Sequence, residues 1–261
     1  MADRSEWPQI ATHGQAYGGP IRGTSRGHRL PMPMEETMRH VKTPRPVHSL
    51  AEIALGLKVM ACPNCGGGPM VARSRSLTFD PRADEVEIKV VCRSCLKSES
   101  FLFAITDADH PGPRALPRKF DEEAILAAAD VVNPTDQPSA LVDVAGWLML
   151  HSLLTDKVRS AAVHARTGAD RQAIRNLQIL AGQCIDEALK FYDVDNDLPP
   201  QDAFFSEAGR IQFHAYPELF VRNRLIDLRS RLPSRAALTD AGETASSVQP
   251  PPCWWRFWRR G

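Results

Sequence analysis

The sequence predicts an α+β protein in which a small β-rich unit precedes an α-helical bundle, between two disordered ends. Three patterns predict this class: two closely spaced cysteine pairs, polar and apolar residues that alternate between those pairs, and apolar residues at steps of three and four through the second half of the chain. The expected parts are an arm (1–48), the β-rich unit (49–105), a proline-rich connection (106–140), the bundle (141–232) and a tail (233–261).

The overall charge balance narrows the classes of function. With 32 basic and 31 acidic residues, the chain has a formal net charge of +1, which argues against a global attraction to nucleic acid or anionic membranes. No run of about 18 apolar residues is present, so a transmembrane helix is not expected. The opening residues lead into no apolar core of a secretory signal, and reduced cysteines then favour the cytoplasm.

The arm, residues 1–48, contains glycine, proline and arginine without a helical or strand period, which is typical of disorder. Its seven basic residues outnumber its four acidic ones, so it is either a contact for phosphate groups or a solvated leader. Ser49 is placed to cap a short helix that runs through Leu57 into the β-rich unit.

The two cysteine pairs, Cys62–Cys65 and Cys92–Cys95, are the most informative feature of the chain. A C-x-x-C turn lets two thiolates converge on one metal ion, and two such turns supply the four soft ligands of a tetrahedral zinc site. Three glycines, residues 66–68, give the backbone freedom to turn after the first pair. Because four protein ligands leave no open coordination position, the predicted Zn²⁺ has a structural role.

The segments between and after the pairs have the pattern of strands. Val86, Ile88 and Val90 alternate with charged residues directly before Cys92, and residues 101–105 form a compact apolar run. A β-hairpin with a cysteine pair at each end, followed by a third strand, resembles a four-cysteine zinc ribbon over residues 58–105. This resemblance implies a fold and a metal site, but no activity.

Other interpretations of the four cysteines stay open. Iron in a rubredoxin-like site accepts the same tetrahedral sulfur ligands, and two disulfides would form in an oxidising compartment. A thioredoxin-like redox motif is disfavoured, because its C-x-x-C leads from a strand into a helix, whereas glycines and strands follow here.

The β-rich unit also offers a candidate surface for nucleic acid. Seven basic residues face five acidic ones over residues 58–105, and many zinc ribbons serve transcription and RNA machinery. The candidate contacts are Arg73, Arg75, Arg82 and Arg93; their clustering on one face would favour nucleic acid, and their dispersal a protein partner. Phe101 and Phe103 are expected either to pack in the core or to stack on bases.

Helical patterns fill the second half. Asp121 and its acidic neighbours predict a helix through Val132. Apolar residues then recur at helical spacing from Trp147 to Ala161, and again from Ile174 to Phe191. Gly168 is expected to end the earlier of these helices and Asp170 to cap the later one, whose apolar seam includes Cys184 as a buried, inert thiol.

Two further helices complete the predicted bundle. Ser206 is placed to cap a short one, and Pro217 to begin another whose apolar stripe runs from Val221 to Leu232. Three or four amphipathic helices joined this closely favour an antiparallel bundle.

The tail ends in a cluster of tryptophan and arginine: Trp254, Trp255, Arg256, Phe257, Trp258, Arg259 and Arg260. Indole rings favour the headgroup layer of a bilayer and arginine is attracted to anionic lipid, so this segment resembles short membrane-active peptides. The same residues also suit a linear motif that docks on a protein partner, and a tail without function is the third alternative.

No credible catalytic constellation is present. The G-x-S-x-G match at residues 23–27 lacks its flanking strand and helix, and the acidic run at 193–197 lacks the glycine and glutamate of a calcium loop. A non-enzymatic adaptor that acts through protein–protein contacts is therefore the leading expectation. A nucleic-acid-binding regulator is the alternative, and an enzyme with an accessory zinc ribbon comes third.

Overall fold

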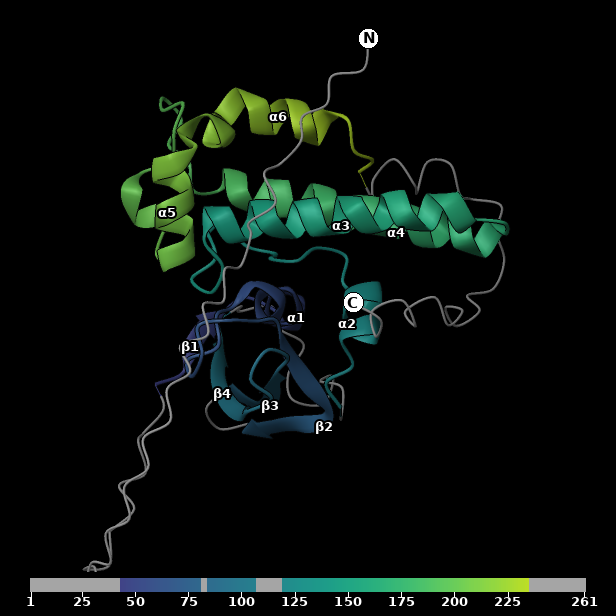
Figure 1. Ribbon diagram of the computed structural model, residues 1–261, viewed down its shortest axis with the longest axis vertical. Helices are drawn as coiled ribbons and strands as arrows, with labels where there is room; N and C mark the ends of the chain where they lie inside the picture. Colours follow the sequence, from purple (N-terminus) through teal and green to yellow (C-terminus); the bar gives the residue numbers. More distant parts are fainter. Residues whose placement is uncertain (1–42, 81–83, 107–118, 235–261) are drawn as a thin grey trace, which may run out of the picture. The chain divides into compact units, whose positions relative to one another are not determined.

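The computed structural model describes residues 43–80, 84–106 and 119–234, which form a four-stranded mixed sheet and six α-helices (Figure 1). The α+β class is therefore confirmed. The strands are β1 (Arg45–Val47), β2 (Met70–Asp80), β3 (Glu85–Cys92) and β4 (Ser98–Ile105). The helices are α1 (Leu50–Val59), α2 (Glu122–Ala128), α3 (Val144–His164), α4 (Gly168–Leu189), α5 (Glu207–Ala215) and α6 (Arg222–Ser230).

The sheet has the strand order β1-β4-β3-β2. Strands β2, β3 and β4 pair antiparallel, and β1 adds to the edge of β4 in parallel. Alternate side chains of β3 and β4 are buried, among them Val86, Ile88 and Phe103, which are fully inaccessible. Phe101 is also buried, so both phenylalanines are core residues and are not available for base stacking.

Strand β1 lies in a segment that the sequence pattern assigned to the arm. Three residues are too few to show a period, and Pro46 argues against a central strand. An edge position tolerates the proline, because only one side of an edge strand forms ladder hydrogen bonds. The sheet therefore begins earlier in the chain than residue 49.

Helix α1 confirms the helix predicted behind Ser49, whose hydroxyl accepts a hydrogen bond from the Glu52 N–H at 3.0 Å. The helix extends two residues beyond Leu57, and its residues 50–57 are all buried. It is enclosed because it packs on β1 and β2 on one side and on α2 and α3 on the other. Gly56 permits this approach, since a Cβ there would lie 2.6 Å from Leu141 Cδ2.

A buried polar network joins α1 to α4. Ser139 donates its hydroxyl hydrogen to the Glu52 carboxylate, and Asn133 Nδ2 donates to Glu187 Oε2 at 3.2 Å. Lys190 Nζ lies 2.8 Å from the other Glu187 oxygen and also donates to the backbone carbonyls of Asn133 and Thr135. The connection between the sheet and the long helices is therefore held by specific contacts on both sides.

These contacts also explain why α2 is shorter than predicted. The expected helix runs to Val132, but α2 ends at Ala128. Beyond it, Ser49 Oγ donates to the Val132 carbonyl and Gln183 Nε2 donates to the Asp130 carbonyl. The segment after Ala128 is thus held in a non-helical path by the N-cap of α1 and by α4.

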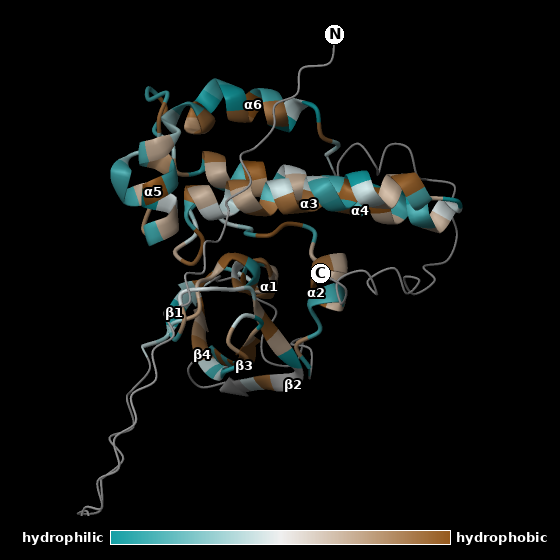
Figure 2. Cartoon of the chain, viewed as in Figure 1, coloured by the Kyte–Doolittle hydropathy of each residue, from teal (hydrophilic) through white to brown (hydrophobic). Residues whose placement is uncertain are grey.

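Helices α3 and α4 form the long hairpin of the structure, and polar and apolar residues alternate along both (Figure 2). Trp147, Leu150 and Leu154 are buried on α3, and Cys184 is buried on α4 as expected. The predicted cap of α4 is wrong by three residues. Thr167 is the N-cap, and Asp170 completes a capping box by accepting from the Thr167 N–H at 2.8 Å.

The last predicted helix is interrupted. Residues Pro217–Phe220 form a 3₁₀ turn, Val221 is extended, and α6 begins at Arg222. Two tertiary contacts fix this break: Phe220 packs edge-on against Phe204, and the Arg222 N–H donates to the Asp197 carbonyl at 2.8 Å. Ser206, by contrast, caps α5 as predicted.

Replacing Gly209 by alanine is expected to separate α5 from the start of α3. A Cβ there would lie 2.5 Å from Asp143 Oδ2 and 2.8 Å from Ser206 Oγ, the pair of groups that joins the two helices. We expect a loss of about 1–3 kcal/mol in the free energy of unfolding, measured by urea denaturation. Gly168→Ala is the matched control, because nothing lies within 4 Å of its Cβ position. Equal stability of the two variants would contradict this packing.

Candidate metal centre

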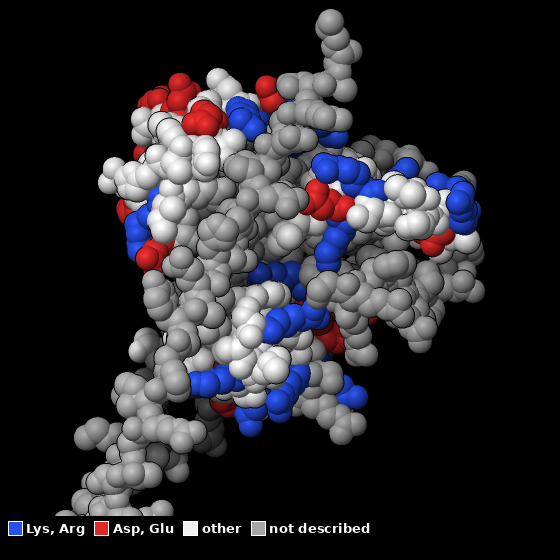
Figure 3. Space-filling model, in the orientation of Figure 1, with Lys and Arg blue, Asp and Glu red and all other residues white. Residues whose placement is uncertain are grey.

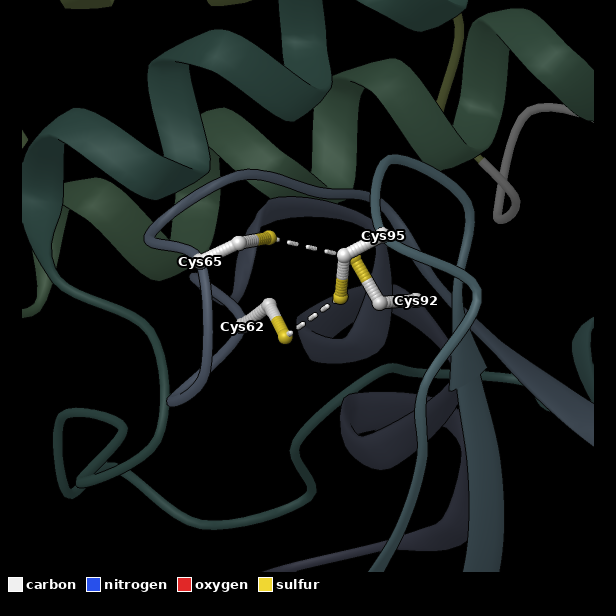
Figure 4. Close-up of side chains that lie close together, drawn as sticks. All are labelled: Cys62, Cys65, Cys92 and Cys95. Atoms are coloured by element: carbon white, nitrogen blue, oxygen red, sulfur yellow. Dashed lines mark hydrogen bonds between the residues drawn. The ribbon is translucent and has the colours of Figure 1, made fainter. Parts of the chain in front are cut away.

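The four predicted cysteine ligands converge at one end of the sheet (Figure 4). Their Sγ atoms all lie within 4.8 Å of one another. The sulfurs of Cys62 and Cys95 are 3.8 Å apart, and those of Cys65 and Cys92 are 3.7 Å apart. Each of these short distances joins one turn to the other, so the cluster ties two segments that are about 30 residues apart in sequence.

Each cysteine pair lies in a turn with the same backbone hydrogen bonds. In the first turn (Cys62–Gly67), the Gly66 N–H donates to the Cys62 carbonyl at 2.8 Å, and the Cys62 N–H donates to the Gly67 carbonyl at 2.6 Å. In the second turn (Cys92–Lys97), the Leu96 N–H donates to Cys92 at 2.9 Å and the Cys92 N–H to Lys97 at 3.0 Å. The two turns are therefore equivalent supports for their sulfurs.

The sheet and two side chains position these turns against each other. Met70 pairs with Cys92 in the β2–β3 ladder, so the strands bring the turns to the same end. Lys97 Nζ donates to Asn64 Oδ1 at 2.7 Å, and Ser94 Oγ donates to the Gly68 carbonyl at 2.9 Å. The arrangement is thus held by contacts other than the sulfurs themselves.

The geometry fits a tetrahedral metal ion. Metal–sulfur bonds of about 2.3 Å to zinc would place the sulfurs of a regular tetrahedron about 3.8 Å apart. The shortest distances between the two turns match this spacing, and the cysteines are free thiols. A disulfide would need a separation of about 2.05 Å. The four side chains can therefore hold one metal ion.

Backbone amides of the second turn favour the thiolate, which is the form that binds metal. The N–H groups of Cys95 and Ser94 donate to Cys92 and lower the pKa of its thiol. The Lys97 N–H donates to Cys95 and lowers the pKa of that thiol to about 6. In the first turn the Gly67 amide also donates to Cys65, but the surrounding sulfurs and desolvation raise the pKa of Cys65 to about 12. A cation at the centre would relieve this repulsion between sulfurs.

The metal end of the sheet is basic, a feature that the whole-unit charge count did not reveal. Segments 58–79 and 88–98, which carry the cysteines, contain six basic residues and no acidic ones. Figure 3 shows lysine and arginine gathered over the sheet region, with few acidic side chains among them. The acidic residues of the hairpin lie at its opposite end, from Asp80 to Glu87.

The candidate nucleic-acid contacts are only partly described. Arg73 is exposed and donates to Ser98 Oγ at 3.2 Å, and Arg93 is exposed in the second turn. Arg82 and the Arg75 side chain lie outside the described residues. Arg93 is also close enough to Lys157 of α3 to affect it: burial first, and then Lys58 and Arg93, lower the pKa of Lys157 to about 7. Sequence spacing gave no signal for this contribution from α3.

The other predicted sites have different outcomes. The tail cluster, Trp254 to Arg260, and the arm before residue 43 lie outside the described residues, so their roles stay predictions. The acidic run at 193–197 is held by Arg222, whose Nη1 donates to the carbonyls of Asp193 and Val194. That contact accounts for the run as a structural turn.

Comparison of the chain with models of protein families, with curated proteins and with solved structures finds no match. Among the described residues, no helix has the length and apolar character needed to cross a membrane.

Proposed function

We propose that this chain is a non-enzymatic adaptor, in which a four-cysteine zinc ribbon and a helical bundle bind other proteins in the cytoplasm. Four thiolates would complete the coordination of Zn²⁺ and leave no position for substrate or water. The metal ion would therefore stabilise the ribbon and hold its turns in place, while function resides in the surfaces that the fold presents. A reducing compartment keeps the ligands available for metal.

The observation that carries this proposal is the exposure of large apolar side chains on the helices. Met149 and Leu153, one turn apart on α3, are each 42% exposed, and Ile211 on α5 is 62% exposed. Adjacent apolar side chains exposed together on one helix face, as Met149 and Leu153 are, suit a surface that packs on a partner. The segment 133–139, hydrogen-bonded to Glu52 of α1 and to Glu187 of α4, would present the helices and the ribbon to a partner as one body.

Introducing a charge on α3 tests this surface most simply, through the variant Leu153→Glu.

 Leu153 itself is exposed, so the substitution is expected to leave the fold intact. Partner proteins are first captured with the metal-loaded wild-type chain and purified. Each purified partner is expected to bind the variant at least about tenfold more weakly than the wild type. Ala162→Glu is the matched control, because Ala162 is exposed on the opposite side of the same helix. Equal binding by both variants would exclude α3 as a docking surface.

A nucleic-acid-binding regulator is the second candidate, and the basic metal end is the observation that favours it. Arg73, Arg93 and Lys97 are exposed there and suit contacts to phosphate, whereas Lys58 is almost buried and ion-paired with Glu122. Fluorescence anisotropy of labelled DNA and RNA, titrated with metal-loaded protein at two salt concentrations, separates the candidates. Tight binding that weakens steeply with salt would favour the regulator, and no binding at low salt would leave the adaptor.

A further inference from the structure

The two cysteine turns make the same demand on the backbone but meet it with different residues. The residue after the second cysteine of each pair has a left-handed conformation, with φ of 70° at Gly66 and 61° at Leu96. The same hydrogen bond, from this residue to the carbonyl of the first cysteine, holds both positions. A glycine would therefore serve in the second turn as it does in the first.

Leucine is an unfavourable choice for this conformation. A Cβ in the left-handed region approaches the following carbonyl oxygen and reduces the population of that state by roughly 5- to 30-fold. Asp84 is the other non-glycine residue with positive φ among the described residues, and aspartate tolerates that region better. The strain at Leu96 is therefore specific to a bulky apolar residue.

Burial does not compensate for this strain, because the Leu96 side chain is 75% exposed. Packing thus gives no reason for leucine at this position in the isolated chain. An unfavourable backbone conformation that presents an apolar side chain to solvent points to a role in binding.

The surroundings of Leu96 define what would bind there. Arg93 and Lys97 flank it in the second turn, and Lys97 is held by its hydrogen bond to Asn64. Arg73 on β2 reaches past β3 and donates to Ser98 Oγ at the start of β4, at 3.2 Å. Leu96 is therefore an apolar side chain within a basic surface, and a partner complementary to it is acidic around an apolar contact.

We propose that Leu96 is the anchor of a protein-docking surface at the metal end, where it packs against the apolar side chains of an acidic, amphipathic partner segment. This inference rests on the proposed adaptor function and names the chemistry of the partner. An aliphatic side chain offers no ring on which a base can stack, and Phe101 and Phe103 are buried in the core. The metal end therefore fits an acidic protein segment better than single-stranded nucleic acid.

To test this proposal, peptides that bind the full, zinc-loaded chain are selected from a displayed library of random 16-residue peptides. The binding of the selected peptides to the wild type is then compared with their binding to Leu96→Gly. We expect enriched peptides to contain acidic and apolar residues and to bind Leu96→Gly at least about tenfold more weakly. The variant should melt about 2–4 °C higher than the wild type, because glycine relieves the left-handed strain. A loss of binding without a loss of stability separates docking from folding. Val194→Ala is the matched control, since Val194 is 82% exposed outside this surface.

The other outcomes overturn the inference in distinguishable ways. Enriched peptides that bind Leu96→Gly as well as the wild type would remove Leu96 as the anchor and leave the adaptor function in place. If no peptide is enriched while a 20-nucleotide single strand binds tightly, both the inference and the adaptor function fail. If neither probe binds, the metal end is not a docking surface.

Discussion

Cys92→Ser is expected to release the metal ion and unfold the sheet region. Serine cannot supply the fourth soft ligand, and metal binding contributes directly to the folding of small metal-held units. The content of zinc should fall from about one ion per chain to about none, measured by atomic absorption after gel filtration. Hydrogen exchange should show lost protection in β2, β3 and β4. Helices α3 and α4 should stay helical because they pack mainly on each other, but they lose the buried contact with α1.

The matched control is Cys184→Ala. Cys184 is buried in α4 and takes no part in the cluster of four thiols, so removing its sulfur should leave the metal content unchanged. Its stability should fall modestly, by about 1–2 kcal/mol, from the lost packing. Retention of zinc and of sheet protection in Cys92→Ser would show that the four sulfurs do not act as one metal site.

Glu187→Gln is expected to remove a pH dependence of stability. Burial raises the pKa of Glu187 to about 7; the nearby Glu52 carboxylate also raises it, whereas Lys190 and Asn133 oppose the shift. A carboxyl whose pKa is raised by folding binds its proton more tightly in the folded state. The stabilisation from this proton is complete below the unfolded pKa, near 4.5, and is lost as the pH rises through the folded pKa, about 7.

The measurement is urea denaturation of the zinc-loaded chain from pH 6 to pH 8. The wild type should lose about 1–2 kcal/mol over this range through Glu187, and Glu187→Gln should lack that component. Asp195→Asn is the control, because Asp195 is an exposed acid. If the free energy of unfolding depends on pH in the same way in the wild type and in Glu187→Gln, the Glu187 carboxyl is not the cause of the pH dependence. If Glu187→Gln does not fold, Lys190→Met is the second variant. The Lys190 ammonium lowers the pKa of Glu187, so its removal should raise that pKa further and move the loss of stability to higher pH.

Local patterns predicted the elements whose causes are local. The spacing of the four cysteines indicated the cluster, because a C-x-x-C turn fixes two sulfurs irrespective of the rest of the fold. Ser49 and Ser206 marked the starts of α1 and α5, since a hydroxyl at the N-cap satisfies a free backbone N–H. The alternation before Cys92 similarly predicted β3, because a strand buried on one face has a period of two.

Features that depend on tertiary contacts were missed. The break at Val221 comes from the packing of Phe220 on Phe204 and from the contact of Arg222 with Asp197. The partnership of Glu52 with Ser139 joins residues 87 positions apart, and no local pattern distinguishes this glutamate from an exposed one. The proximity of Lys157 to the metal end likewise depends on how α3 packs. Sequence patterns report the preferences of neighbours along the chain, whereas these contacts arise from the assembled fold.

X-ray absorption at the zinc edge of the purified, metal-loaded chain tests the central claim most directly. A structural tetrathiolate site predicts one zinc ion per chain with four sulfur ligands at about 2.3 Å and no nitrogen or oxygen in the first shell. Nitrogen or oxygen ligands, or a water in the fourth position, would contradict a closed structural site and would return attention to metal-assisted chemistry at this end of the sheet.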